Sequence, residues 1–195
     1  MNANDTFYDN EVLQKVAEAL AKNPRAKFLF GDADYISEDK KTSRIQTYEK
    51  ITNSFALLAN NICHQSIFYK KSLFDKFGKY SSDYSIYSDW DFNIKCLVEN
   101  KVAAIYLPTA ICKFQLGGAC SNSKEKHNCK IDKNLLIERY FNNYKFLIKA
   151  DAFLKKNFKL LYSPLKKVII NPIAKSYSSQ CKYLLTVKTS ELKIS

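Results

Sequence analysis

The first strong pattern of apolar and polar positions predicts an amphipathic helix over residues 9–23. Asp9 and Asn10 precede this stretch as capping residues, and Pro24 follows it. Between them, apolar residues recur at the three- and four-residue spacing that gathers them on one side of a helix: Val12, Leu13, Val16, Ala17 and Leu20. We therefore expect a helix that buries one face.

A short apolar run over 27–30 predicts the first strand. It ends at Gly31 and Asp32, so the strand should carry acidic side chains to its C-terminal end. Residues 34–36 predict the start of a return strand, and the polar stretch 38–44 predicts a surface turn.

Helices and strands continue to alternate up to about residue 114. We expect helices over 51–60 and 89–99, and a short helix over 71–77 that Gly78 ends. Strands are expected at 66–69, 102–107 and 110–114, the last two separated by a turn at Pro108. Such alternation predicts an α/β domain.

From residue 132 the apolar positions follow a long helical period with lysines between them, and Pro164 and Pro172 divide the later part. We place a boundary in the polar run 121–126. The interpretation is an α/β domain over 1–121 and a basic, amphipathic helical tail over 122–195.

The net charge of +12 belongs almost wholly to that tail. Residues 1–121 hold 15 Lys and Arg against 14 Asp and Glu, whereas residues 122–195 hold 16 against 5. A lysine-rich segment can meet a nucleic acid or an anionic membrane face. Arginine, which suits base and phosphate recognition, occurs only at 25, 44 and 139, so nucleic-acid binding ranks last.

The six cysteines form no C-x-x-C pair, which favours reduced thiols in a cytoplasmic protein. The best zinc pattern, Cys120 with His127 and Cys129, lacks a fourth ligand. No apolar run approaches the roughly 20 residues that a membrane span needs.

Three candidate acidic sites occur at residues 2–5, where Asp5 is the one carboxylate, at Asp32 with Asp34, and at Asp89 with Asp91. Carboxylates two positions apart can share a hard divalent cation, and a carboxylate at a helix start can act as a general base. Each cluster is also typical of a solvated turn or a helix cap.

Four segments in order resemble the family-2 glycosyltransferases. Residues 2–13, NANDTFYDNEVL, resemble their metal-binding segment, and residues 63–74, CHQSIFYKKSLF, resemble the acceptor-side strand and helix. Residues 87–92, YSDWDF, are similar to the segment of the catalytic base, and residues 114–121, FQLGGACS, to the loop that follows. Together the matches cover roughly residues 1–121.

The resemblance implies a partial GT-A fold, which is a Rossmann-like nucleotide-diphospho-sugar transferase domain. It implies transfer of a sugar from a nucleotide-sugar donor to a saccharide or lipid-linked acceptor, with inversion, in cell-surface polysaccharide biosynthesis. Asp89 would be the base, and Asp5 with Asn4 would hold a divalent cation, Mg or Mn. Asn2 and Asn4 replace the usual aspartates, so the cation should bind weakly.

Six residues of these segments are candidates for substrate binding. His64 and Gln65 could contact acceptor or phosphate, or form a hydrogen-bonded pair. Trp90 could stack on a sugar ring or pack in the core. Glycines permit a tight loop near phosphates, although glycine pairs also simply form turns. The candidates are His64, Gln65, Trp90, Asp91, Gly117 and Gly118.

In the family, about 80 to 100 nucleotide-binding residues precede the acidic triplet, where open α/β folds bind nucleotides. This sequence lacks them, so we expect a truncated form or one half of a split enzyme. The alternative is an inactive remnant or a partner-binding half-domain. Aromatic residues interleaved with lysines over 130–195 could hold the protein at the inner face of a membrane.

Overall fold

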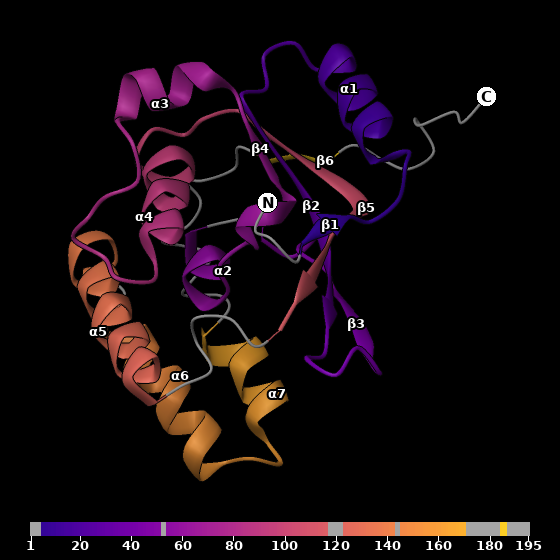
Figure 1. Cartoon of the computed structure of the whole chain (residues 1–195). Coiled ribbons are helices and arrows are strands. Elements are labelled where there is room, and N and C mark those ends of the chain that lie inside the picture. The colour runs from indigo at the N-terminus through magenta and orange to yellow at the C-terminus, as the bar shows by residue number, and fades with distance from the viewer. Residues whose placement is uncertain (1–4, 52–53, 117–122, 143–144, 171–183, 187–195) are drawn as a thin grey trace.

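The computed structural model describes residues 5–51, 54–116, 123–142, 145–170 and 184–186 (Figure 1). Their fold is mixed α/β, as expected from the sequence, with a central mixed sheet and helices on both faces. The main order of strands is β1–β5–β2–β3; in addition, β4 pairs with β2 and β6 pairs with β5.

The two long strands form the centre of the sheet. β2 (Phe28–Ile36) and β5 (Ala104–Gln115) run parallel along their whole length. β3 (Ser43–Gln46) and β4 (Ile67–Tyr69) pair antiparallel with opposite halves of β2. On the far side of β5, β1 (Thr6–Phe7) pairs antiparallel and β6 (Leu184–Thr186) parallel. Both central strands are largely buried and mainly apolar, as strands covered on two faces are.

Helices cover the two faces of the sheet unequally. Of the described helices, α1 (Val12–Lys22) is the one that covers one face, where it buries its apolar stripe against Leu29, Ile105 and Ile111. On the other face lie α2 (Ser54–Ala59), α3 (Lys71–Phe77) and α4 (Ser88–Ile94), which continues as a π-helical turn to Glu99 (Figure 1). The larger core lies beneath these three helices.

β2 corrects one expectation from the sequence. The apolar run does not stop at Gly31 but continues as one strand to Ile36, so Asp32 and Asp34 lie inside the sheet. The return strand is β3, after a turn over 37–42. Pairing with β5 along the whole length of β2 outweighs the local signal of glycine and aspartate.

β5 corrects a second expectation, because Pro108 lies inside a continuous strand and not in a turn. The partner of Gly31 is Leu107, but the partner of Asp32 is Ala110, so two residues bulge out of the pairing. Proline has no N–H to give to a neighbouring strand, and a bulge is where a sheet tolerates it.

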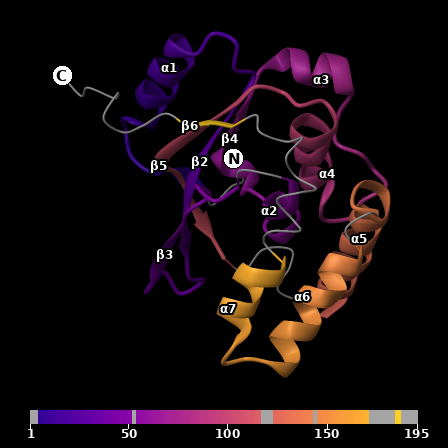
Figure 2. The same ribbon diagram turned by 180° about the vertical axis from the view of Figure 1, so that it is seen from behind.

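The helical C-terminal region is partly integrated with the α/β part. α5 (Ser123–Tyr140) contributes Leu136 to the larger core, and Phe141 after it is also buried there. The boundary near residue 122 stays a prediction, but the hydrophobic core crosses it. α6 (Lys145–Asn157) and α7 (Tyr162–Leu165), with a π-helical turn to Ile170, lie side by side beyond α5 (Figure 2). Within the described ranges, no helix is both long and apolar enough to cross a membrane.

Candidate active site

Asp89 lies in the first turn of α4, where two donors hold its carboxylate. Asn61 Nδ2 donates to Asp89 Oδ2 at 3.0 Å, and the backbone N–H of Trp90 donates to Oδ1 at 2.8 Å. His64 Nδ1 lies 3.7 Å from Oδ2. The Asp89 side chain keeps 16% of its surface exposed, so it is not fully closed off from solvent.

A chain of hydrogen bonds orients the amide of Asn61. Tyr69 OH donates to Asn93 Oδ1 at 2.7 Å, and Asn93 Nδ2 donates to Asn61 Oδ1 at 3.0 Å. Because Asn61 Oδ1 is already accepting, its Nδ2 is the atom turned toward Asp89. β4, α4 and the segment after α2 therefore fix the carboxylate jointly.

Burial raises the pKa of Asp89 above its ordinary value. The nearby His64 and the hydrogen bonds from Trp90 and Asn61 offset part of that rise in pKa, because each favours the charged form. A carboxyl group whose pKa is raised takes up a proton more readily, which suits a general base.

The short helical segment His64–Ser66 brings the two predicted acidic sites together. His64 turns toward Asp89, whereas Gln65 turns toward the N-terminal segment. The buried Gln65 donates from Nε2 to Asp5 Oδ2 at 2.7 Å and accepts from Cys63 Sγ at 3.2 Å. Asp5 and Asp89 thus contact consecutive residues of one segment.

A cleft of about 630 Å³ opens beside Asn61. The β2–β3 hairpin and its turn form one wall; the segment after α2, the start of α4 and one residue of α5 form the other. Its lining residues are Tyr35, Ser37, Thr42, Ser43, Arg44, Gln46, Tyr48, Asn60, Asn61, Tyr87, Trp90, Leu116 and Lys133. Asn61 lines the cleft and also binds Asp89, so this one side chain connects the cleft with the carboxylate.

Two of the predicted substrate-binding residues are engaged with the protein itself. Trp90 is 4% exposed and donates from Nε1 to the carbonyl of Leu57 at 3.0 Å. Asp91 is fully buried, accepts from Tyr140 OH at 2.7 Å and lies 3.4 Å from Lys95 Nζ. These contacts favour structural roles for both side chains, although the edge of Trp90 also lines the cleft.

The literal D-x-D of β2 is divided between the two faces of the sheet. Asp32 accepts from the backbone N–H of Tyr48 at 3.0 Å and from Tyr106 OH at 2.9 Å. Tyr48 and Tyr106 belong to the larger core, so Asp32 lies on that face of the sheet. The pairing is irregular between Asp32 and Ala33, and Ala33 and Tyr35 also point into the larger core, so Asp34 between them points to the opposite face. The pair therefore does not converge on one ligand.

Asn4, Gly117, Gly118 and Cys120 lie outside the described residues, so the roles expected of them stay predictions. The described part of the chain holds no group of three or more His, Cys, Asp or Glu side chains able to bind a metal ion. At the predicted cation site it supplies one carboxylate, Asp5, which Gln65 already engages. These residues alone do not form a cation site.

Sequence reasoning missed the amides that orient Asp89, and it missed the cleft. Asn61 and Asn93 have no spacing that a motif could reveal, because their partners come from different elements. The cleft depends on how the hairpin meets α5. Asn61, which stands two residues before the matched segment 63–74, was the nearest signal available.

Comparison with known proteins gives relatives of one kind. Over 123 residues the chain is 28% identical to the PGL/p-HBAD biosynthesis glycosyltransferases of Mycobacterium bovis (strain BCG / Pasteur 1173P2) and Mycobacterium tuberculosis (strain ATCC 25618 / H37Rv). The match covers 63% of this chain and 46% of each relative, so the chain spans about half the length of the relatives it matches. No protein-family model matches the chain. The similarity supports a glycosyltransferase.

Proposed function

We propose that this chain is the acceptor-side part of an inverting glycosyltransferase in which Asp89 is the general base. The observation that carries the proposal is the position of Asp89. Its carboxylate is at a helix start and is fixed by Asn61, a residue that lines a cleft of ligand size. The similarity to named glycosyltransferases supports the same reaction class.

In the proposed reaction, an acceptor hydroxyl group lies in the cleft within hydrogen-bond reach of Asp89. As its oxygen forms a bond to the anomeric carbon of a nucleotide sugar, its proton passes to the carboxylate. The bond from that carbon to the nucleoside diphosphate breaks, and the diphosphate leaves with the electron pair. One displacement assisted by one base inverts the configuration at the sugar carbon.

The proposed cation would neutralise the charge that develops on the leaving diphosphate. Asp5, with Asn4, would hold it. Gln65 orients the Asp5 carboxylate through a 2.7 Å hydrogen bond. The described residues supply one carboxylate at this position. The proposed proton transfer from the acceptor hydroxyl group therefore involves Asp89 and no residue of the cation site.

The relatives are named for PGL/p-HBAD biosynthesis, and we extend a biosynthetic role to this chain as a proposal. The acceptor would be a saccharide or lipid-linked saccharide of the cell surface, and the enzyme would work peripherally at the inner face of a membrane. The amphipathic helices after α5 support that location, because they join exposed apolar side chains to lysines.

The test compares Asp89→Asn with wild type in two measurements. Isothermal titration with UDP-sugars and manganese measures donor affinity, and release of UDP in the presence of saccharide acceptors measures transfer. Asp89→Asn should lower transfer by about 10²- to 10⁴-fold and leave donor affinity unchanged. Asp83→Asn, which alters an exposed acid before the same helix, is the matched control and should transfer normally. Equal loss of transfer and donor affinity would refute the assignment of the base.

A second candidate is a half-domain that binds a partner and has no activity alone. The single carboxylate at the cation site favours it. In the same titration, absence of donor binding at millimolar UDP-sugar would select this candidate over autonomous activity.

A further inference from the structure

The cleft that Asn61 lines is positively charged. Of its described lining residues, Arg44 on β3 and Lys133 on α5 carry a charge, and both are cationic. Among the described residues, neither is in an ion pair with a carboxylate. The remaining lining side chains are neutral, most of them hydroxyl, phenol and amide groups that can bind a saccharide.

Each cation is held in place by a neighbour in the cleft wall. Arg44 Nη2 donates to Gln46 Oε1 at 3.2 Å, which leaves other guanidinium donors to face a ligand. Lys133 Nζ lies 5.6 Å from the centre of the Trp90 ring, a cation–π contact. Preoriented cations lose less side-chain entropy when they bind an anion.

We propose that the cleft binds an acceptor saccharide that carries an anionic group, with Arg44 and Lys133 as its specificity-determining residues. This rests on the proposed function, because it makes the cleft the acceptor site. The reacting hydroxyl group would lie at the Asn61 end, next to Asp89, and the anion between the hairpin and α5. A carboxylate of an acidic sugar and a phosphate on a saccharide share this chemistry, since arginine binds either in a bidentate manner.

The chain contains its own reporter for this site, because Trp90 is its single tryptophan and lines the cleft. Titrations would follow Trp90 fluorescence with three probes: methyl glucuronide, methyl glucoside 6-phosphate and the neutral methyl glucoside. Affinity is taken from the concentration dependence and not from the amplitude. We expect both charged probes to bind at least fivefold more tightly than the neutral one. Added salt should weaken the binding of the charged probes. Whichever charged probe binds more tightly identifies the kind of anion.

Arg44→Gln and Lys133→Gln should each weaken the charged probes about fivefold and leave methyl glucoside unchanged. Lys71→Gln, which removes an exposed lysine of α3, is the control and should change nothing. Equal affinity for neutral and charged probes, or unchanged affinity in Arg44→Gln, would overturn the proposal.

The two proposals fail in different ways. UDP-sugar titrated into the same variants should bind with wild-type affinity, because Arg44 and Lys133 line the acceptor cleft. If UDP-sugar does not bind at all while the charged probes still depend on Arg44, the proposed transferase function fails and an anionic-saccharide site remains. If donor binding and transfer depend on Asp89 but the neutral probe binds equally well, the anion proposal alone is wrong.

Discussion

At the scale of single residues, the candidate site depends on the Asp89 carboxylate, whose charged form the fold stabilises only in part. Burial disfavours the charged form of Asp89, and its neighbours compensate only in part, so its pKa stays raised. A better compensated carboxylate would be a weaker base. The same balance makes the side chain useful for proton transfer and unfavourable for stability.

His64 should tune the pKa of Asp89. Its charge is the largest influence that lowers this pKa, so His64→Gln should raise the pKa further. The measurement is an NMR titration of the Asp89 side-chain carboxyl carbon. His127→Gln, which changes the other histidine of the chain, on α5, is the matched control and should leave the titration of Asp89 unaltered. A curve for His64→Gln that overlays that of wild type would contradict this assignment.

Asp89→Asn should stabilise the fold at neutral pH. A carboxyl group whose pKa is higher in the folded than in the unfolded state favours folding less as pH rises through the folded-state pKa. Asparagine has no such dependence. The melting temperature of Asp89→Asn should therefore exceed that of wild type at pH 7 to 8. Below pH 3.8, the ordinary pKa of an aspartate side chain, this difference in melting temperature should shrink. If Asp89→Asn melts at a lower temperature than wild type both at pH 7 to 8 and below pH 3.8, the Asp89 carboxylate stabilises the fold.

At the scale of elements, the sequence allowed most helices to be predicted but misjudged the two central strands. α1 and α3 follow from local periodicity and a glycine or proline stop, which neighbouring residues determine. β2 and β5 depend on each other, because the bulge at Pro108 and Thr109 fits against a glycine. A Cβ at Gly31 would lie 2.7 Å from the carbonyl oxygen of Thr109. No single segment contains that relation.

The residues of the candidate site also differ in whether the sequence could predict them. Asp89, His64 and Gln65 were found because they stand in segments that resemble a family. Asn61 and Lys133 were missed because their importance comes from packing between distant elements. Sequence patterns point to the candidate base more readily than to the residues that position it.

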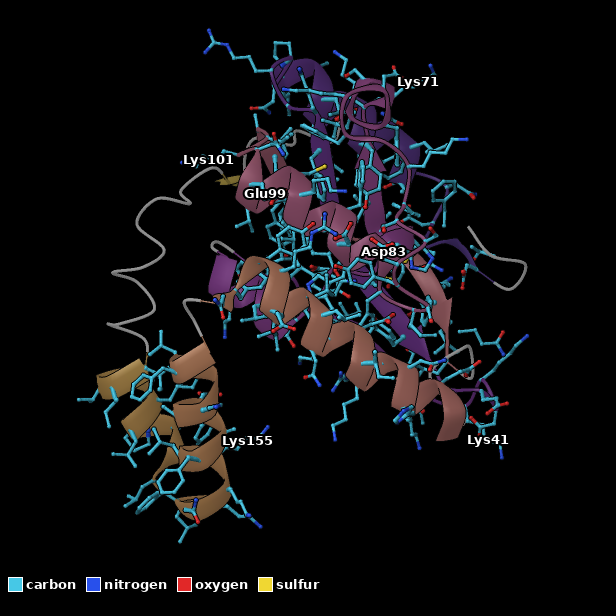
Figure 3. The ribbon with its side chains drawn as sticks, turned by 90° about the vertical axis from the view of Figure 1, so that its left-hand side faces the viewer. Lys41, Lys71, Asp83, Glu99, Lys101 and Lys155 are labelled. Carbon is cyan, nitrogen blue, oxygen red and sulfur yellow. The ribbon has the colours of Figure 1, made fainter. Side chains whose placement is uncertain are left out.

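The α6–α7 region should bind anionic membranes through the loop between its helices. Residues 145–170 carry seven lysines against one aspartate, and Leu160 at the tip is 98% exposed. Figure 3 shows Lys155 on α6, apart from the body that holds Lys71 and Asp83. The exposed apolar side chains of the α6–α7 region are Phe146, Phe153, Phe158, Leu160, Leu161, Val168 and Ile169. This combination is typical of a helix pair at a lipid surface.

Flotation with phosphatidylglycerol-containing vesicles measures this binding. Changing Leu160 and Leu161 together to serine should weaken it about tenfold or more, because two side chains no longer enter the acyl boundary. The matched control is Leu13→Ser, which alters a half-exposed leucine on α1. Equal binding to neutral phosphatidylcholine vesicles would argue against a role for the lysines. If the protein instead dimerises with rising concentration, and the double serine variant does not, the surface serves self-association.

At the scale of the whole molecule, α5 connects the helical region to the candidate base. Asp132 Oδ2 accepts from the backbone N–H groups of Ile86 and Tyr87, at 2.7 and 3.0 Å, just before α4 begins. Tyr140, the last residue of α5, donates to Asp91 inside α4. The helix that carries Asp89 is therefore fixed from outside the segment that resembles glycosyltransferases, and the tail is part of the site's support.

Truncation tests whether the fold ends near residue 121 or includes α5. A chain of residues 1–121 should lose the near-ultraviolet circular dichroism of Trp90 and its cooperative thermal transition, because it lacks Asp132, Leu136 and Phe141. Residues 1–142 should keep both, with a lower melting temperature than the full chain because β6 no longer pairs with β5. The comparison between the two truncations is the control for loss of the remaining residues. If 1–121 unfolds cooperatively at the temperature of 1–142, α5 is an appendage and the boundary predicted from charge and periodicity is correct.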